Sequence, residues 1–282
     1  MSRRRAGRLR RVAWTALILV GVYLFVAYVA LPRMWTHYEH EPGLAGRPML
    51  TVTGDGIPGD PLNVGLVGTK EEAIRALAAA GWYPADAITF RSSVEIAGSV
   101  LFDRPYRDAP VSPLFYDGKS QAFAFEKPLG TSADRRNHVR FFATLEKGAA
   151  GRPVWLGSAT FDRGVGVSHY TGEITHHIGP DIDAERTLLM GDLTAAHMLT
   201  EIYDVTGVGP TLFGKNGGGD PYYTDGELRI GVVSAGAEPQ TAPLEVLPNP
   251  PAVELKNRLF SKVKPYLADE APPEVENTDI SN

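Results

Sequence analysis

The sequence predicts an α+β fold: a single mixed domain of antiparallel hairpins packed on two main helices, preceded by one transmembrane helix. Three observations support this prediction. Residues 12–31 form an uncharged run of twenty residues near the N-terminus. Helix-capping residues occur at residue 69 and again near residue 181. Between these points, apolar and polar residues alternate with the period of two that is typical of half-buried antiparallel strands.

The composition excludes several classes of protein. The 282 residues are 43% hydrophobic and 22% charged, which is typical of a globular chain and excludes wholesale disorder or collagen-like structure. The sequence contains no cysteine, which excludes disulfide scaffolds, thiolate zinc sites and iron–sulfur clusters. Six arginines lie before residue 12, and all 33 acidic residues follow them. The chain after these arginines is too acidic to bind the phosphate backbone of nucleic acids, and we expect no nucleic-acid partner.

The N-terminal sequence predicts a single-pass membrane protein anchored through Val12–Leu31. Twenty helical residues span about 30 Å, the thickness of the hydrocarbon core of a bilayer. Because six arginines precede the run and only Arg33 follows closely, we expect a cytoplasmic N-terminus and an extracytoplasmic main domain at an inner or plasma membrane. A cleaved signal peptide is the competing interpretation. It would have a shorter apolar run and a small-residue cleavage site, which the ending Tyr-Val-Ala-Leu-Pro does not provide.

The chain is expected to divide into five segments. They are a basic cytoplasmic segment over 1–11, a signal-anchor helix over 12–31, a linker over 32–48, an α+β domain over 49–235, and a proline-rich, acidic, disordered tail over 236–282. In the linker, His37 and His40 look solvent-exposed; they could bind a metal or be solvated loop residues. In the tail, one short amphipathic stretch carries Leu255, Leu259 and Val263.

The domain is expected to open with a short apolar strand after Asp60-Pro61, followed by its first main helix. Thr69 and Glu72 have the spacing of a capping box, in which each side chain accepts a backbone hydrogen bond from the other residue. Ile74, Leu77 and Ala78 share one face of this helix, and Gly81 ends it. Trp82 is expected in the core. Residues 92–101 are a candidate for a short second helix.

Two hairpins are expected to follow. The first joins residues 112–116 to 119–127 through a tight turn at Asp117-Gly118. The second joins 138–146 to 153–162. In the second hairpin, the odd-numbered residues of both strands are apolar and must face one core, so odd positions pair with odd positions.

The even-numbered face of the second hairpin holds the most informative polar residues: His138, Arg140, Thr144, Ser158, Thr160 and Asp162. We expect His138 to pair with Asp162, with their Cβ atoms about 5 Å apart. Polar outer faces of antiparallel strands are common, so a solvated face is the alternative. A Ser158–His138–Asp162 triad is a weaker interpretation because the sequence has no Gly-x-Ser-x-Gly elbow.

The segment after this hairpin contains further candidate ligand residues and the start of the second main helix. His176 and His177 are expected on a short strand, and Asp181 or Asp183 caps the second main helix. Its apolar stripe, running towards Ile202, consists of Leu188, Leu189, Leu193 and Ala196. His176, Asp183 and Glu185 could hold a divalent metal, although the spacing matches no His-Glu-x-x-His signature and acids at a helix start also complement its dipole.

The remaining motifs suggest structural roles. His169 stands alone in a glycine-rich turn and His197 lies late on the second main helix, and both are expected to be structural. The glycine-rich sequence at 214–220 lacks the spacing of a phosphate-binding loop and predicts a flexible loop. Residues 227–234 read as the last strand.

Several strings together resemble one family, that of the LssY C-terminal domain. They are DPLNVGLVG, AAGWYPAD, APVSPLFYDG, AFAFEK, RRNHVRFF, PVWLGSATFDRGVG and THHIGPDIDAERTLLMGDL, and they cover about residues 55–235. The chain departs from the family pattern at Lys119, Ala122 and Asn137. It matches at His138, Arg140, Asp162, His176, Asp181, Asp183, Glu185 and Arg186. In longer relatives the domain follows membrane domains resembling lipid phosphatases, so the resemblance implies work near lipid phosphates.

Three functional hypotheses follow. In the first, the protein binds a phosphorylated, lipid-phosphate-like envelope ligand through Arg140, Arg186, His138 and either Arg135 or Arg136. In the second, it hydrolyses a phosphoester with His138, Asp162 and His176 as catalytic candidates, with or without a divalent metal. In the third, it is a structural module that docks to an envelope protein. The first two need the hairpin residues and the residues at the start of the second main helix to meet in one site.

Overall fold

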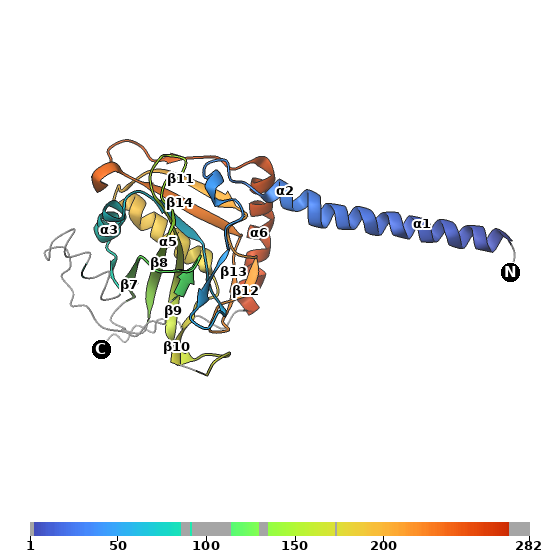
Figure 1. Ribbon diagram of the computed structural model, residues 1–282, viewed down its shortest axis with the longest axis horizontal. Coiled ribbons are helices and arrows are strands. Elements are labelled where there is room, and N and C mark those ends of the chain that lie inside the picture. The colour runs from blue at the N-terminus through green and yellow to red at the C-terminus, as the bar shows by residue number, and fades with distance from the viewer. Residues whose placement is uncertain (1–2, 86–90, 92–113, 130–134, 173, 271–282) are drawn as a thin grey trace.

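The computed structural model describes residues 3–85, 91, 114–129, 135–172 and 174–270. Figure 1 shows a long N-terminal helix projecting from a domain in which helices are layered on a large sheet. This mixture confirms the predicted α+β class. The short helix expected over 92–101 lies outside the described residues.

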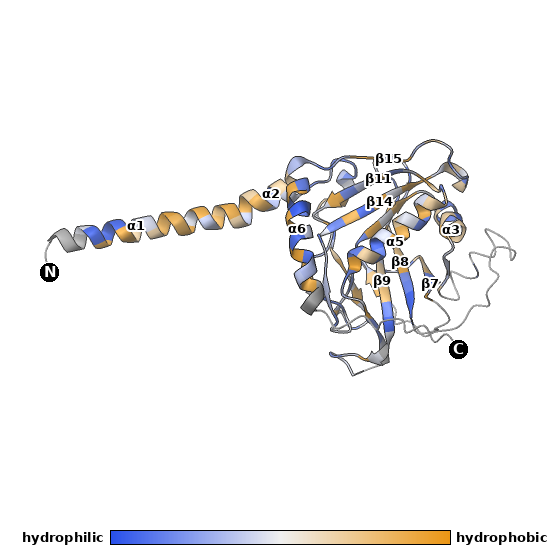
Figure 2. Ribbon diagram, turned by 180° about the vertical axis from the view of Figure 1, so that it is seen from behind, coloured by the Kyte–Doolittle hydropathy of each residue, from blue (hydrophilic) through white to orange (hydrophobic). Residues whose placement is uncertain are grey.

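The N-terminal helix is longer than the sequence pattern indicates. Helix α1 (Arg3–Phe25) continues through a π-helical segment, η1 (Val26–Ala30), into α2 (Leu31–Trp35). Gly7–Trp35 is long and apolar enough to cross a membrane, and its most apolar window is not buried in the domain. Figure 2 shows the hydrophilic start and the apolar body of this helix. One candidate membrane helix therefore lies at the N-terminus, as predicted from length and composition.

The main sheet runs in the order β15-β11-β14-β3-β9-β8-β7-β4, with β10 paired to β9. Neighbouring strands are antiparallel, except that β14 pairs with β3 and β11 pairs with β15 in parallel. The strands are β3 (Val64–Val67), β4 (Tyr83–Pro84), β7 (Phe123–Pro128), β8 (Arg136–Leu145), β9 (Val154–Val167), β10 (Ile174–Ile178), β11 (Leu199–Thr206), β14 (Glu227–Val233) and β15 (Glu245–Val246).

Two helices, α3 (Lys70–Ala79) and α5 (Ile182–Ala195), share a core with one face of this sheet. The indole nitrogen of Trp82 in this core donates to Asp192 at 2.9 Å, which explains how its polar atom is satisfied. The alternate residues of each strand point to the other face. The core between the helices and the sheet contains Ile74, Leu77, Phe123, Val139, Phe141, Ala159, Leu189 and Leu193.

A smaller sheet packs against one end of the other face. Its order is β2 (Pro58–Pro61), β1 (Leu50–Thr53), β5 (Leu114–Tyr116) and β6 (Lys119–Ser120). Leu114 and Tyr116 share an apolar cluster with Phe142 and Leu156 of the main sheet. Beyond this apolar contact, the same face of β8 and β9 carries polar side chains. A separate hairpin is formed by β12 (Phe213–Lys215) and β13 (Pro221–Tyr223).

The register of β8 and β9 corrects one prediction. Odd residues pair with odd residues, as expected, but His138 lies opposite Thr160, and Asp162 lies opposite Arg136. The observed pairing differs from the expected one by two residues. A bulge between Ala143 and Leu145 changes the register by one residue near the turn and so brings odd residues opposite odd residues. The even face is also buried in the protein, so the solvated alternative is wrong.

The first predicted hairpin is only half correct. Asp117 and Gly118 form the expected turn with φ values of 49° and 73°, which a tight hairpin turn requires. The strand after the turn divides, however. Its first part, β6, stays in the small sheet, and its second part, β7, joins the main sheet.

The helix ends follow their capping residues. Thr69 and Glu72 form the predicted capping box at α3, and Asp181 caps α5 by accepting a hydrogen bond from the backbone of Ala184. Helix α5 ends at Ala195 and does not run towards Ile202, because His197 adopts a left-handed φ of 58°. Leu188, expected in the apolar stripe, is exposed.

The expectations for the linker and the tail need correction. His37 is buried at 3% exposure, and its backbone pairs with Thr206 of β11. Within the predicted tail, residues 251–270 form α6 (Pro251–Glu270). Val253 and Phe260 are its buried apolar residues, whereas the expected apolar stripe faces outward. Tertiary contact with the domain orders both segments.

Candidate functional site

Polar side chains gather on the face of the main sheet opposite α3 and α5. Because Val139 and Ala159 point to the helices, His138, Arg140 and Ser158 alternate onto this second face. We call the group the buried polar cluster. It consists of Glu126, Arg136, His138, Arg140, Ser158, Thr160, Asp162 and His176 from the main sheet and Asp60 from β2.

Arg136 organises the cluster by joining two acids. Its Nη1 lies 2.7 Å from Glu126 Oε2, and its Nε lies 3.2 Å from Asp162 Oδ2. Glu126 comes from β7 and Asp162 from β9, so the guanidinium bridges the strands on both sides of β8. Among the described residues, Arg136 Nη2 has no hydrogen-bond partner. One donor of this buried cation therefore remains available.

His138 is buried at 3% exposure between Glu126 and Thr160, its neighbours across the sheet. Burial holds its pKa well below the usual value, and the positive charges of Arg140 and Arg136 lower the pKa further. The imidazole is therefore neutral at pH 7. Its Nε2 makes no hydrogen bond within the part of the chain that the structure describes, and the same is true of Ser158 Oγ.

Burial acts in the opposite direction on the carboxyl groups. It raises the pKa of Asp162 although Arg136 and His176 oppose the change, and it raises the pKa of Asp60 although Arg140 opposes it. Burial also raises the pKa of Glu126 against the influence of Arg136. His176 Nδ1 lies 3.8 Å from Asp162 Oδ2, which is too far for a hydrogen bond. The expected pairing of His138 with Asp162 is not formed either, because Asp162 lies opposite Arg136.

The low pKa of His138 predicts a loss of stability in acid. A group whose pKa is lower in the folded state favours folding above its unfolded value of 6.5, and this contribution is lost as the pH falls. Below pH 6.5, wild type should lose up to about 1.4 kcal/mol per pH unit more than His138→Asn. Urea unfolding of the full chain in detergent at pH 7.5 and 5.5 measures this difference. His197→Asn, at an exposed residue, is the control and should follow wild type.

The structure separates residues that the sequence placed in one site. Arg186 lies on α5, on the helix side of the sheet, where its guanidinium holds Asp225 at 2.8 and 2.6 Å and donates to the backbone oxygen of Glu227. Asp183 joins this second network by accepting from Thr224 Oγ1 at 2.6 Å. The structure brings His138, Arg140, Arg136, Asp162 and His176 together on the opposite face of the sheet. Arg186, Asp183 and Glu185, all on α5, belong to the other side.

Two members of the cluster were missed from the sequence. Glu126 alternates with Phe123 and Phe125 in β7, so strand parity could have placed it beside His138. Asp60 could not be found in this way because it belongs to the other sheet. Its carboxylate accepts a 3.4 Å hydrogen bond from Asn216. Asn216 also accepts from the backbone of Gly218 and Asp220, so the loop expected to be flexible has internal hydrogen bonds.

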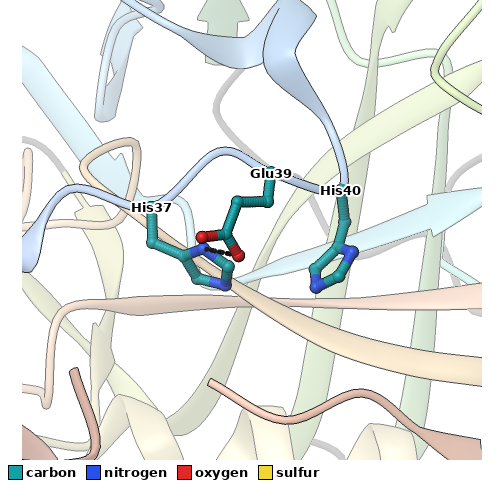
Figure 3. A group of neighbouring side chains, drawn as sticks. All are labelled: His37, Glu39 and His40. Carbon is teal, nitrogen blue, oxygen red and sulfur yellow. Dashed lines mark ion pairs between the residues drawn. The ribbon is translucent and has the colours of Figure 1, made fainter. Parts of the chain in front are cut away.

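Two side-chain groups within the described residues have a geometry that could hold a metal ion. One is His37, Glu39 and His40 (Figure 3), and the other is His169, His177 and Asp220. In each group, one ligand atom from every residue lies within 4.8 Å of the others. The set predicted from the sequence, His176 with Asp183 and Glu185, is not one of them. His169, expected to be isolated, lies 5.6 Å from His177 between ring centres.

Fold and site together define the class: an α+β domain with a buried charged cluster, joined to a helix long enough to span a membrane. The chain belongs to the LssY C-terminal family, since the family described as LssY C-terminus matches residues 44–228. Comparison with curated proteins gives no match, and neither does comparison with solved structures. The matched range contains the whole buried polar cluster, whereas α1, α2 and α6 lie outside it.

Proposed function

We propose that the protein is a single-pass membrane protein whose LssY C-terminal domain lies outside the cytoplasm and binds a phosphorylated, lipid-phosphate-like ligand of the cell envelope. The observation behind this proposal is the set of unsatisfied polar atoms on one face of β8 and β9. Arg136 Nη2, His138 Nε2 and Ser158 Oγ are buried and lack hydrogen-bond partners among the described residues. Buried polar groups are normally paired, so three such atoms together indicate a missing ligand or ordered water.

Each of these atoms suits an acceptor oxygen. A guanidinium nitrogen and a hydroxyl donate to phosphate oxygens, and a neutral imidazole can donate from Nε2 in one tautomer. Glu126 and His176 have side chains 18% and 19% exposed, so the cluster reaches the surface beside them. A head group could approach there.

The charges of the cluster favour a singly charged ligand. Two arginines, Arg136 and Arg140, face the carboxyl groups of Asp60, Glu126 and Asp162. Burial raises the pKa of each carboxyl, so these groups hold their negative charge less firmly than they would in water. The two guanidinium and three carboxyl groups together therefore leave a net charge of small magnitude. A phosphodiester with one negative charge therefore suits the cluster better than a phosphomonoester with two.

The orientation of the protein follows from its N-terminal charges. Six arginines precede the apolar part of Gly7–Trp35, and positively charged segments remain on the cytoplasmic side of a membrane. The domain, including the proposed binding site, would then lie on the opposite side. This agrees with an envelope ligand.

Calorimetric titration of the full chain in detergent with short-chain phosphatidylglycerol tests the binding proposal. The phosphate-free diacylglycerol serves as the comparison ligand. Arg140→Gln should weaken phosphatidylglycerol binding at least about tenfold, because a hydrogen bond to a charged group contributes about 1.5–3 kcal/mol. The control is Arg229→Gln, whose side chain pairs with Asp204 and faces the α5 side of the sheet. Equal binding by wild type and Arg140→Gln would contradict the proposal.

Hydrolysis is the less favoured alternative. His138 has a pKa well below neutral, so it is a weak general base at pH 7, and His176 is not hydrogen-bonded to Asp162. Chromatography of the same titration mixtures for cleaved lipid would reveal turnover. A chain that neither binds nor cleaves phosphatidylglycerol would leave the structural, docking role.

A further inference from the structure

A group of polar side chains lies where the chain enters the domain after α2. His37, Glu39 and His40 follow one another closely in sequence, and Figure 3 shows both imidazole rings and the Glu39 carboxylate directed into one space. The His37 backbone is held by two 3.1 Å hydrogen bonds with Thr206 of β11. This pairing places the three side chains at a fixed position on the edge of the domain.

Both histidines have buried ring nitrogens without the partners that buried polar groups normally have. The His37 side chain is 1% exposed, and its Nδ1 lies 3.0 Å from Glu39 Oε2. His37 Nε2 and His40 Nε2 are buried without a hydrogen-bond partner among the described residues. The rings lie 5.5 Å apart and nearly perpendicular. Two unsatisfied buried nitrogens that approach one carboxylate are what a metal ion would satisfy.

We infer that His37, Glu39 and His40 bind a divalent transition-metal ion of the zinc class, with water in the fourth position. Two imidazoles and one carboxylate are a common ligand set for such ions. Because all three ligands lie within residues 37–40 and His37 pairs with β11, the ion would fix the conformation of this segment where it meets the sheet. The inferred role is structural, and it does not depend on the proposed phosphate ligand.

Cobalt titration of the full chain in detergent, after treatment with EDTA, tests this site. Tetrahedral Co²⁺ gives visible absorption bands that Zn²⁺ should abolish by competition. We expect His40→Ala to weaken Co²⁺ binding at least about tenfold, since even residues that only orient the ligands change affinity by about this factor. Glu39→Gln should also weaken binding, and its side chain is 64% exposed, so it leaves the fold intact.

Two further variants make the result specific. His197→Asn removes an exposed histidine and should bind Co²⁺ as wild type does. His169→Ala disrupts the other His–His–Asp group and should leave the bands assigned to His40 in place. If Co²⁺ binding is unchanged in both His40→Ala and Glu39→Gln, or is lost only in His169→Ala, the inference is wrong.

A different observation concerns α6. Helix α6 contacts α2, and Figures 1 and 2 both show it on the side of the domain from which α1 leaves, lying across the direction of α1. Val253 and Phe260 are buried on its inner side. Lys256 and Lys264 pair with Glu227 and Asp181. The opposite side of α6 therefore faces the direction in which the membrane helix extends.

That outer side is apolar with a basic margin. Leu255, Leu259, Val263 and Tyr266 recur at helical spacing and are 46%, 51%, 47% and 73% exposed. Arg258 and Lys262 are exposed beside them. Such a face is typical of helices that lie in the interfacial layer of a bilayer, where apolar side chains enter the lipid and basic ones meet anionic head groups.

The geometry points to the lipid surface as the partner of this face of α6. The inference rests on the proposed membrane anchor, because only a bilayer crossed by α1 would lie next to α6. It extends that proposal by giving the domain a second membrane contact, which would restrict its orientation. A second copy of the chain is the competing partner.

Fluorescent labelling tests this contact, since the chain has no cysteine and each introduced thiol is unique. Full chains carrying Leu19→Cys in α1, Leu259→Cys in α6 or Ala79→Cys in α3 are labelled and reconstituted into phosphatidylcholine–phosphatidylglycerol vesicles with nitroxide-bearing lipids. The labels at residues 19 and 259 should lose most of their fluorescence, and the label at residue 79 should keep it.

The three positions separate the failures. Quenching at residue 19 without quenching at residue 259 would overturn the α6 contact and leave the anchor standing. Absence of quenching at both would overturn the anchor as well. If lipid does not quench the label at residue 259 but its fluorescence varies with protein concentration, the face binds a second copy of the chain. That result would contradict the inference.

Discussion

Replacing Arg136 by methionine should lower the free energy of unfolding by about 3–5 kcal/mol, the range expected when one partner of a buried ion pair is removed. Arg136 is the cation in direct contact with both Glu126 and Asp162. Its side chain is 5% exposed, so water cannot replace it. Urea unfolding of the full chain in detergent, followed by tryptophan fluorescence, measures the loss. A loss below about 1 kcal/mol would show that Glu126 and Asp162 become neutral when Arg136 is absent.

A matched arginine controls for the change of side chain. Arg229 pairs with Asp204 through two hydrogen bonds of 2.8 and 3.1 Å, but its side chain is 29% exposed. Arg229→Met should therefore cost no more than about 1 kcal/mol. The penalty of Arg136→Met should also shrink as the pH falls, because protonation of Glu126 and Asp162 removes the charges left without a partner. A penalty independent of pH would contradict this explanation.

Replacing Arg186 by methionine should also cost about 3–5 kcal/mol. Arg186 binds Asp225 with both terminal nitrogens and lies 3.4 Å from Asp183, and its side chain is 3% exposed. This contact lowers the pKa of Asp225, although burial acts against it. The carboxylate of Asp225 therefore stabilises the fold above its unfolded pKa of 3.8, and this contribution is lost as the pH falls through the lower folded value. Over this pH range, the free energy of unfolding of Arg186→Met should therefore fall less than that of wild type, as measured by urea unfolding at each pH.

A double variant distinguishes two networks from one. Arg136→Lys and Arg186→Lys keep the charge but lose the forked geometry, so the protein that carries both substitutions should remain folded. Because the two arginines lie on opposite faces of the sheet, their effects should add within about 0.5 kcal/mol. A coupling above about 1 kcal/mol would mean that the two networks are connected, as the single site expected from the sequence required.

Local signals were the most reliable part of the sequence analysis. The capping box at Thr69 and the cap at Asp181 are correct because each involves residues three positions apart, whose geometry needs no distant contact. Strand parity correctly put His138 and Arg140 on the same face as Ser158, because side chains alternate in any strand. The predicted pairing of His138 with Asp162 was wrong by two residues, since the turn length and the bulge that set the register cannot be read from composition.

Long-range packing determined the errors in the site. Nothing in the sequence indicates that Asp60, on the small sheet, faces Arg140, or that the sheet separates Arg186 from the histidines. The same limitation applies to His37, which looks like a loop residue until its backbone pairs with β11. Similarly, Leu255 and Leu259 have the spacing of a core stripe, but their orientation depends on which side of α6 meets the domain.

By itself, the sequence determined the apolar N-terminal helix, the α+β class and the set of residue types available for chemistry, because these depend on composition and on periods of a few residues. The family followed from the resemblance of several sequence strings to its pattern. Only the tertiary structure decided which charges share a site, which histidines are buried and which face of α6 remains uncovered. These properties depend on contacts between segments tens to hundreds of residues apart, whose relative placement is set by the packing of whole sheets and helices.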